Sequence, residues 1–273
     1  MKSAPGPAPR LRTVFISDVH LGFRGCQAEY LLKFLNTLDA EQLVLVGDIV
    51  DLWSLQRVAF WPAAHTDVLR AILRLAREGM RVVYVPGNHD EGFRELCGSE
   101  ISGIEIRRDF IHVAADGKRY LVLHGDDFDH AVKFSGVLKA TGEWLYDVIL
   151  WAGRMIQGVR HRFGFGYWSL ATWIKSRVPD ARRYIDRFER AAAYEAGRHG
   201  LDGVICGHIH QPGIRDVDGV LYCNDGDWVE HCSALVEDRN GQLGLVTFTG
   251  AQTELNAVAP VPQVSPAPLG VAA

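Results

Sequence analysis

Short hydrophobic runs, each followed by polar residues, recur along the chain. They cover residues 13–16, 42–46, 81–85, 120–123 and 203–206. Short apolar runs that end at polar or turn residues are typical of buried strands. Between the first three runs, residues 28–38 and 66–78 carry apolar side chains at helical spacing. The alternation of strand and helix predicts an α/β fold with a mostly parallel sheet.

After residue 206 the pattern changes to two hairpins. Apolar residues at 214–217 and 220–223 flank an Asp-Gly pair, and those at 233–237 and 243–248 flank an Asn-Gly pair. Both dipeptides are preferred in the two-residue loops that join antiparallel strands. The last third of the chain is therefore expected to be β-rich.

The segment 131–200 differs from its surroundings in pattern and charge. The regular series of apolar strand patterns is interrupted here by long patterns with helical spacing. The segment holds 12 Lys and Arg against 6 Asp and Glu, and it contains 12 of the 27 aromatic residues of the chain. The whole chain, in contrast, has a net charge of −4. We interpret the segment as a helical insertion, or lid, in one domain of residues 13–255, with flexible tails at 1–12 and 256–273.

Three roles fit this insertion. It could be an ordinary helical cap whose aromatic residues are core, or a lid that binds an anionic and apolar ligand or lies on a membrane surface. Arg interleaved with aromatic residues could also stack nucleic-acid bases. The acidic net charge argues against a general nucleic-acid binder.

Other features narrow the class of protein. Five cysteines without a C-x-x-C pair indicate neither a disulfide framework nor a zinc ribbon, and they fit a reducing cytoplasm. No apolar stretch approaches the roughly 18 residues of a spanning helix, so membrane contact is expected to be peripheral. P-loop, serine-hydrolase and zincin motifs are absent from the sequence. Nothing in it indicates an oligomeric state.

Polar clusters follow the five predicted strands: Asp18-Val19-His20, Gly47-Asp48, Gly87-Asn88-His89-Asp90, His124-Gly125-Asp126 and Gly207-His208-Ile209-His210. Because ligands bind at the carboxyl ends of strands in an open α/β sheet, the clusters are expected to converge. Any one of them could be an ordinary turn or a structural histidine, but five at successive strand ends are poorly explained by chance. Carboxylate, imidazole and amide donors suit Mn²⁺, Fe²⁺ or Zn²⁺.

Seven such groups are too many for one ion and suit two ions that share a carboxylate. We assign Asp18, His20 and His210 to one ion, Asn88, His124 and His208 to the other, and Asp48 to both. Water between two such ions loses a proton near neutral pH, and both ions can bind a phosphoryl oxygen. The set therefore predicts hydrolysis of a phosphate ester or anhydride.

The clusters resemble, in order, the five signatures of the calcineurin-like metallophosphoesterases: Asp18-x-His20, Gly47-Asp48-x-x-Asp51, Gly87-Asn88-His89-Asp90, His124 and Gly207-His208-x-His210. The resemblance spans roughly residues 13–237. It implies a four-layer α/β/β/α sandwich with a dinuclear metal site.

Within that family, residues 17–22, the insertion after His124 and residues 223–230 resemble the UDP-2,3-diacylglucosamine diphosphatase group. The resemblance implies a Mn²⁺-dependent enzyme of lipid A synthesis that cleaves a UDP-linked diacylated sugar to UMP and a lipid 1-phosphate. The insertion would then contact acyl chains and phosphates at the inner face of the cytoplasmic membrane. The candidate substrate contacts are Asn88, Asp129, Arg154, Arg160, Lys175 and Arg177.

One residue departs from that group. Its well-studied members carry Arg after the Asn of the third signature, whereas this chain has His89, as in the wider superfamily. A histidine there can act as a general acid or stabilise phosphoryl charge, and Asp51 or Asp90 could orient it. We therefore take His89 and Asp51 as the candidate catalytic pair.

Two alternatives stay open. A phosphodiesterase for another nucleotide or phospholipid would cleave soluble diesters that carry no acyl chain. A metal-free scaffold of this fold would only bind other proteins, although such scaffolds can lose ligands and here the set is complete.

Overall fold

The hydrophobic runs form the central strands of two stacked sheets in the computed structural model, which describes residues 10–130, 179–248 and 253–256. The first sheet has the order β13-β12-β11-β1-β2-β3-β5-β4, and the second has the order β6-β7-β8-β10-β9. Strands β1, β2 and β3 pair in parallel, as do β7, β8 and β10. The two predicted hairpins are the antiparallel pairs β9–β10 and β11–β12.

The strands are β1 (Leu11–Ile16), β2 (Ala40–Val46), β3 (Arg81–Val85), β4 (Glu100–Ile101), β5 (Ile104–Ile106), β6 (Phe110–Val113), β7 (Arg119–Val122), β8 (Gly203–Cys206), β9 (Gly213–Val217), β10 (Val220–Asn224), β11 (Ser233–Glu237), β12 (Leu243–Phe248) and β13 (Thr253–Asn256). The helices are α1 (Ala28–Thr37), α2 (Leu52–Arg57), α3 (Ala63–Arg77) and α6 (Pro179–Arg198), with 3₁₀ turns η1 (Glu91–Leu96) and η2 (Asp126–His130).

The central strands β1, β2 and β3 of the first sheet are buried on both faces over most of their length, which explains their short apolar runs. In β1 and β2, Phe15 and Val44 face the second sheet, whereas Val14 and Leu43 lie under the helices α1 and α3. The inner layer between the sheets also contains Ile205 of β8. Alternate side chains of one strand thus enter two different cores.

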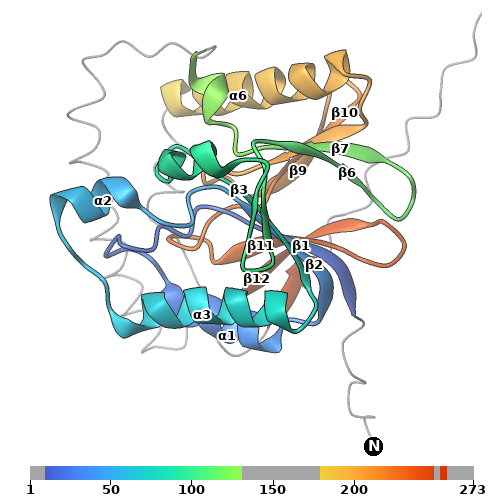
Figure 1. The fold of residues 1–273 in the computed structure, drawn as a ribbon. Coiled ribbons are helices and arrows are strands. Elements are labelled where there is room, and N and C mark those ends of the chain that lie inside the picture. Colours follow the sequence, from blue (N-terminus) through green and yellow to red (C-terminus); the bar gives the residue numbers. More distant parts are fainter. Residues whose placement is uncertain (1–9, 131–178, 249–252, 257–273) are drawn as a thin grey trace, which may run out of the picture.

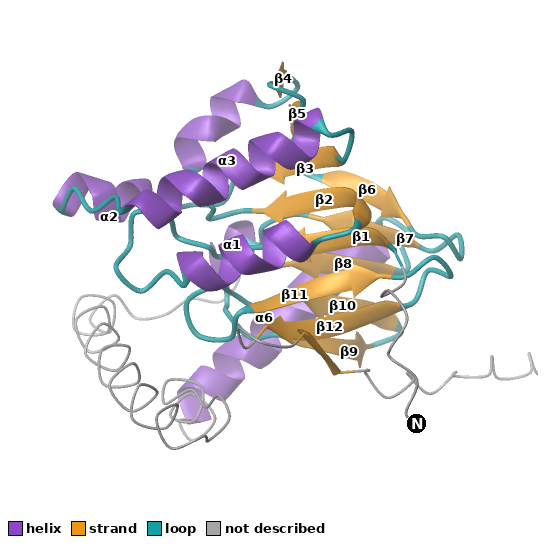
Figure 2. Ribbon diagram, turned by 90° about the horizontal axis from the view of Figure 1, so that it is seen from below, coloured by secondary structure: helices purple, strands orange, loops and turns teal. Residues whose placement is uncertain are grey.

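The domain has four layers, with α1 and α3 on one side and α6 on the other (Figures 1 and 2). Phe188 and Ala192 of α6 pack on Val204 and Tyr222 of the second sheet. The predicted α/β/β/α architecture is confirmed. Helix α6 falls within the predicted insertion 131–200 and forms the fourth layer, while residues 131–178 lie outside the described part of the chain.

The observed boundaries of some strands and helices differ from the predicted ones by a few residues. Strand β1 begins at Leu11 and β13 ends at Asn256, so residues that we expected in the tails pair in the first sheet. Helix α3 begins at Ala63, directly after Pro62, whose fixed φ suits a helix start. Among the described residues, no helix has the length and apolar composition needed to cross a membrane.

Candidate metal centre

The seven predicted metal ligands lie at the carboxyl ends of strands from both sheets. In the first sheet, Asp18 and His20 follow β1, Asp48 follows β2 and Asn88 follows β3; in the second, His124 follows β7, and His208 and His210 follow β8. Backbone hydrogen bonds join neighbouring strand ends, from Asp18 N to Gly47 O at 3.1 Å and from Gly207 N to His124 O at 3.1 Å. The site therefore lies where the two sheets meet.

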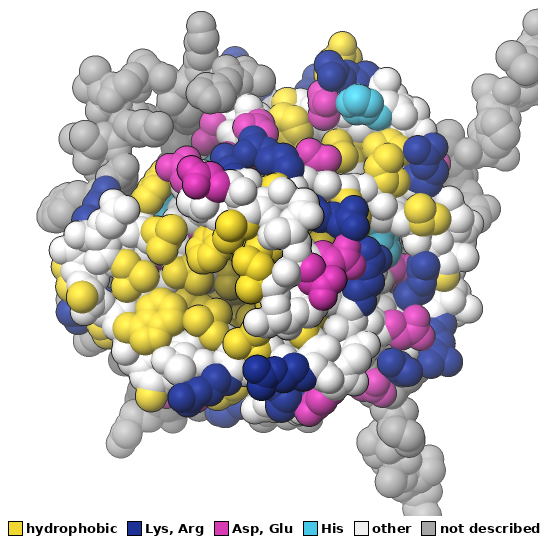
Figure 3. Space-filling view, in the orientation of Figure 1, with side chains coloured by type: hydrophobic (Ala, Val, Ile, Leu, Met, Phe, Trp, Pro, Cys, Tyr) yellow, Lys and Arg dark blue, Asp and Glu magenta, His cyan; other side chains and the backbone are white. Residues whose placement is uncertain are grey.

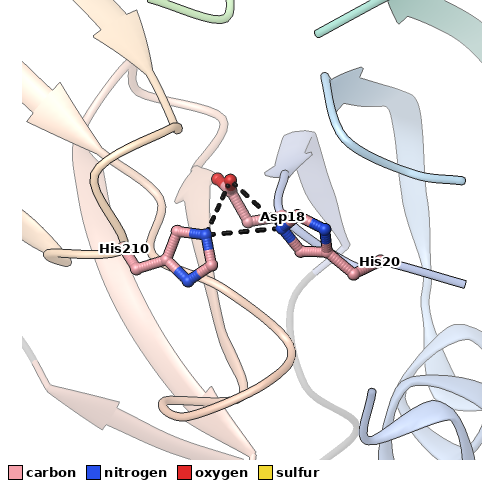
Figure 4. Close-up of side chains that lie close together, drawn as sticks. All are labelled: Asp18, His20 and His210. Atoms are coloured by element: carbon pink, nitrogen blue, oxygen red, sulfur yellow. Dashed lines mark hydrogen bonds and ion pairs between the residues drawn. The ribbon is translucent and has the colours of Figure 1, made fainter. Parts of the chain in front are cut away.

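One cluster consists of Asp18, His20 and His210, whose side chains point toward one another (Figure 4). His210 Nε2 lies 3.1 Å from Asp18 Oδ1 and 3.4 Å from His20 Nε2, and His20 Nε2 lies 3.8 Å from Asp18 Oδ1. Asp18 Oδ1 is buried and makes no hydrogen bond to the described residues. These three atoms match the set assigned to one ion.

A second cluster consists of Asp48, His124 and His208, with Asn88 beside it. His124 Nδ1 donates to Val46 O at 2.8 Å, which directs Nε2 into the cluster. That nitrogen lies 3.3 Å from Asp48 Oδ2 and 3.2 Å from Asn88 Oδ1. Three electron-pair donors that converge in a buried site fit a bound cation, so the residues present suit a metal.

Asp48 lies between the two clusters. Its Oδ2 is 3.3 Å from His124 Nε2 and 3.9 Å from His20 Nε2, while its Oδ1 accepts from His89 N at 2.8 Å. The carboxylate can therefore reach donors of both clusters, as expected of a bridging ligand. The structure brings all seven predicted ligands together.

The backbone at these strand ends is unusual. Five of the seven residues have positive φ, between 49° and 70°: Asp18, His20, Asp48, His208 and His210. A positive φ is uncommon outside glycine and persists only where the surroundings fix it, typically at functional sites. The turns thus orient side chains that a regular strand would direct to alternate faces.

Glycines leave space for neighbouring ligands. A Cβ atom on Gly87 would stand 2.2 Å from Asp48 Oδ1, and one on Gly207 would stand 2.4 Å from Asp18 Oδ2. Since real contacts of this kind are longer than 3 Å, any larger residue would displace a carboxylate. The glycines of these signatures therefore shape the site sterically.

Asp51 connects the metal cluster to the candidate acid His89. Its Oδ2 accepts from His20 Nδ1 at 3.2 Å and its Oδ1 lies 3.0 Å from His89 Nδ1. The same carboxylate caps helix α2 by accepting from Ser54 N at 2.7 Å. One side chain thus both orients His89, as expected from the sequence, and caps a helix.

Trp53 also contacts His89, with ring centroids 4.2 Å apart. Its indole is 41% exposed, and Val58 and Trp61 in the connection from α2 to α3 are exposed as well. Figure 3 shows hydrophobic side chains gathered on the face that carries α2 and α3. No local signal in the sequence indicates that Trp53 lies against His89, because the two residues are separated by 36 positions.

Asp90 has a different partner from the one considered. It is buried and accepts from Gly87 N at 2.6 Å and from Ile49 N at 2.7 Å. Burial and the charge of Asp48 raise the pKa of Asp90. Asp90 therefore holds the backbone directly after the ligand Asp48 and directly before the ligand Asn88. The residue that contacts His89 is Asp51.

Charge balance in the site favours cations. Burial would raise the pKa values of Asp18, Asp48 and Asp51, but the adjacent histidines outweigh burial and hold all three below their ordinary values. For His89 the balance is reversed: burial lowers its pKa, yet the Asp51 hydrogen bond and nearby carboxylates raise it overall. Three ionised carboxylates in a buried cluster attract positive charge.

The predicted substrate contacts fall in two groups. Asp129 lies at the rim, with Oδ2 3.1 Å from His208 Nε2 and Oδ1 accepting from Tyr184 OH at 2.6 Å. Asp126, three residues earlier in the chain, forms an ion pair with Arg94 through both carboxylate oxygens, at 2.7 and 2.8 Å. Outside the described residues lie Arg154, Arg160, Lys175 and Arg177.

Comparison with known proteins decides the family. The model of the calcineurin-like phosphoesterase family matches residues 11–212. The chain belongs to this family. Its members are metallophosphoesterases, so the clusters described here fall where a divalent-metal site is expected.

Curated relatives extend the match over most of the chain. A UDP-2,3-diacylglucosamine hydrolase of Xanthomonas axonopodis pv. citri is 28% identical over 85% of this chain and 97% of its own. One from Porphyromonas gingivalis is 29% identical over 84% and 95%, and one from Neisseria gonorrhoeae is 25% identical over 84% and 95%. These relatives and the family match indicate a hydrolase.

Solved structures to which the chain is similar include a single mutant of Vps29 from Entamoeba histolytica and a phosphoesterase from E. coli. The first has a TM-score of 0.45 and 15% identity and covers 90% of this chain and 97% of its own. The second has a TM-score of 0.46 and 15% identity, with coverage of 90% and 99%.

Proposed function

We propose that this protein hydrolyses the pyrophosphate of a UDP-linked diacylated sugar, UDP-2,3-diacylglucosamine or a close analogue, to UMP and a lipid 1-phosphate. The observation that carries the proposal is the convergence of all seven ligand side chains in a chain whose relatives bear the name UDP-2,3-diacylglucosamine hydrolase. Residues of the basic and aromatic insertion, including Arg154, Arg160, Lys175 and Arg177, would contact the amphiphilic substrate and the membrane surface.

Two divalent ions, Mn²⁺ by preference, would be held by the two clusters, with Asp48 shared between them. When bound, they would polarise the phosphoryl group and lower the pKa of water. His20 is suited to its part because Asp51 accepts from its Nδ1, so that Nε2 faces Asp18 and His210. His124 is fixed in the same manner by Val46 O.

His89 would supply the proton to the leaving group. Hydrolysis forms a bond between a water oxygen and phosphorus, with loss of a proton from the water, and breaks the bond from phosphorus to the bridging oxygen. That oxygen leaves with the lipid phosphate and takes the proton of His89. Asp51 at 3.0 Å holds His89 Nδ1, and the side chain is 26% exposed, so its other nitrogen can reach a substrate. Trp53 restricts the imidazole from one face.

A second candidate is a metallophosphodiesterase for another nucleotide or phospholipid. It is favoured by His89, which stands where the well-studied UDP-2,3-diacylglucosamine diphosphatases resembled by this chain carry Arg. Hydrolysis of the UDP-linked lipid, compared with that of a soluble diester under equal metal conditions, separates the two. Preference for the lipid by a large factor in kcat/KM supports the first candidate, and equal or opposite preference supports the second.

A further inference from the structure

The two oxygens of Asp18 have separate surroundings. Oδ2 accepts from His208 N at 2.8 Å and lies 2.5 Å from Ser17 Oγ, while Oδ1 faces His210 Nε2 at 3.1 Å. One oxygen is therefore anchored and the other is directed into the cluster. Because the carboxylate is completely buried, the groups that anchor Oδ2 determine where Oδ1 points.

Ser17 is the junction of this arrangement. Its Oγ lies 2.5 Å from Asp18 Oδ2, 2.6 Å from Asp225 Oδ1 and 3.2 Å from Gly226 O. A hydroxyl group donates a single hydrogen bond, so three oxygens cannot all receive its proton. The two short contacts from Ser17 to carboxyl oxygens therefore require one more proton, on either Asp18 or Asp225.

The surroundings of Asp225 favour the acid form. The side chain is fully buried, and its Oδ2 makes no hydrogen bond to the described residues. Burial raises the pKa of Asp225 well above its ordinary value, and the charge of Asp18 adds to this although Ser17 opposes it. An isolated ionised carboxylate in such a place would be very costly, whereas a neutral acid is tolerated.

We propose that Ser17 and Asp225 are positioning residues for the metal ligand Asp18. The neutral acid of Asp225 donates to Ser17 Oγ, and Ser17 in turn donates to Asp18 Oδ2. Without the donor at position 225, the Ser17 hydroxyl can turn to Gly226 O, which already lies 3.2 Å away. This inference rests on the metal centre of the proposed function and adds two residues that support it.

The test is binding of Mn²⁺ alone to metal-free protein, measured by calorimetry for the wild type and variants. Ser17→Ala and Asp225→Ala should weaken the affinity of one of the two sites by ~10–100-fold, as is usual when a group that orients a ligand is lost. Asp225→Asn should stay within about 3-fold of wild type, because its amide can donate to Ser17. The double variant Ser17→Ala/Asp225→Ala should be no weaker than the single variants, because both lie in one chain of hydrogen bonds.

Ser233→Ala is the matched control. The Ser233 hydroxyl is also buried and donates to the backbone oxygen of Asp225 at 2.9 Å, yet it makes no bond to Asp18. It should bind Mn²⁺ as the wild type does. Weakening by Ser233→Ala equal to that by Ser17→Ala would show general packing damage and overturn the proposal.

Three further results would also overturn it: near-normal Mn²⁺ affinity in Ser17→Ala, equal losses in Asp225→Asn and Asp225→Ala, or additive losses in the double variant. Infrared difference spectroscopy should show the carbonyl band of a buried neutral carboxyl group that is present in the wild type and lost in Asp225→Asn; the absence of such a difference would refute the proton assignment. A wild type that binds no Mn²⁺ would refute the metal centre itself, and this inference with it.

Discussion

A carboxylate between the two sheets gives a quantitative test of how the layers are joined. Glu237 of β11 is completely buried, and its oxygens accept from Arg12 Nη1 at 2.5 Å, from Ala115 N at 2.8 Å and from His112 Nε2 at 2.7 Å. Arg12 belongs to the first sheet and His112 to the second. We expect Glu237→Gln to weaken the contact between the two sheets. The Gln side chain would place an amide NH₂ group, which donates, next to N–H groups that also donate.

The magnitude follows from the pKa. Burial would raise the pKa of Glu237, but its three hydrogen bonds and the Arg12 and His112 partners lower it from 4.5 to about 2. That difference corresponds to about 3 kcal/mol of folding free energy at neutral pH. For a domain of this size it predicts a Tm about 6–10 °C lower in Glu237→Gln. The stabilisation is complete above pH 4.5 and is lost as the pH falls toward 2, so the difference in Tm should shrink over that range.

Glu105→Gln is the matched control. Its carboxylate also has a pKa of about 2, through Arg81 and Arg107, but both arginines are about half exposed. Solvent screens such pairs, and the Tm should change by less than about 3 °C. Thermal unfolding followed by circular dichroism from pH 7 to pH 3 measures both variants. Equal Tm shifts in the two variants, or a Tm difference between Glu237→Gln and the wild type that does not change with pH, would refute the stabilising role of the ionised Glu237.

Three further predictions concern the site. Asp48→Asn should reduce kcat by about 10³-fold or more, because it removes the carboxylate shared by both clusters; near-normal turnover in steady-state assays would exclude the dinuclear arrangement. His89→Ala should keep its metal content, measured by elemental analysis, while kcat drops by ~10²–10⁴-fold, and loss of metal would instead make His89 a ligand. Deletion of residues 131–178 should impair hydrolysis of the lipid substrate far more than that of a small chromogenic diester, whereas equal losses would indicate a structural role only.

The sequence was most informative where the signals were local. Buried strands such as β2 and β8 each contain a short apolar run, and a polar cluster follows each strand directly. The parallel order of the strands then implies that the cluster ends converge. This is why both the α/β class and the grouping of the ligand side chains could be predicted without coordinates.

Short strands at or next to the edge of a sheet could not be predicted. Strands β4, β5 and β6 contain two to four residues each, and Ile101 and Ile111 in them are exposed. So short a segment shows no periodicity, and pairing with a neighbour defines it as a strand. The strand β13 pairs with β12 beyond the expected end of the β-rich region.

The residues that support the ligands could not be predicted either, because their contacts join distant positions of the chain. Ser17 and Asp225 are 208 positions apart, and Trp53 and His89 are 36 apart, so nothing local connects them. Asp225 is part of the segment 223–230 by which the chain resembles the diphosphatase group, but that resemblance does not indicate what its side chain does. Their roles follow from packing between distant segments.

The most direct test of the central claim is identification of reaction products by mass spectrometry. Purified protein with Mn²⁺ is incubated with UDP-2,3-diacylglucosamine, and Asp48→Asn serves as the control. We expect UMP and diacylglucosamine 1-phosphate from the wild type and neither from the variant. No turnover of this lipid by a wild type that cleaves a generic phosphodiester in a metal-dependent manner would contradict the proposed substrate.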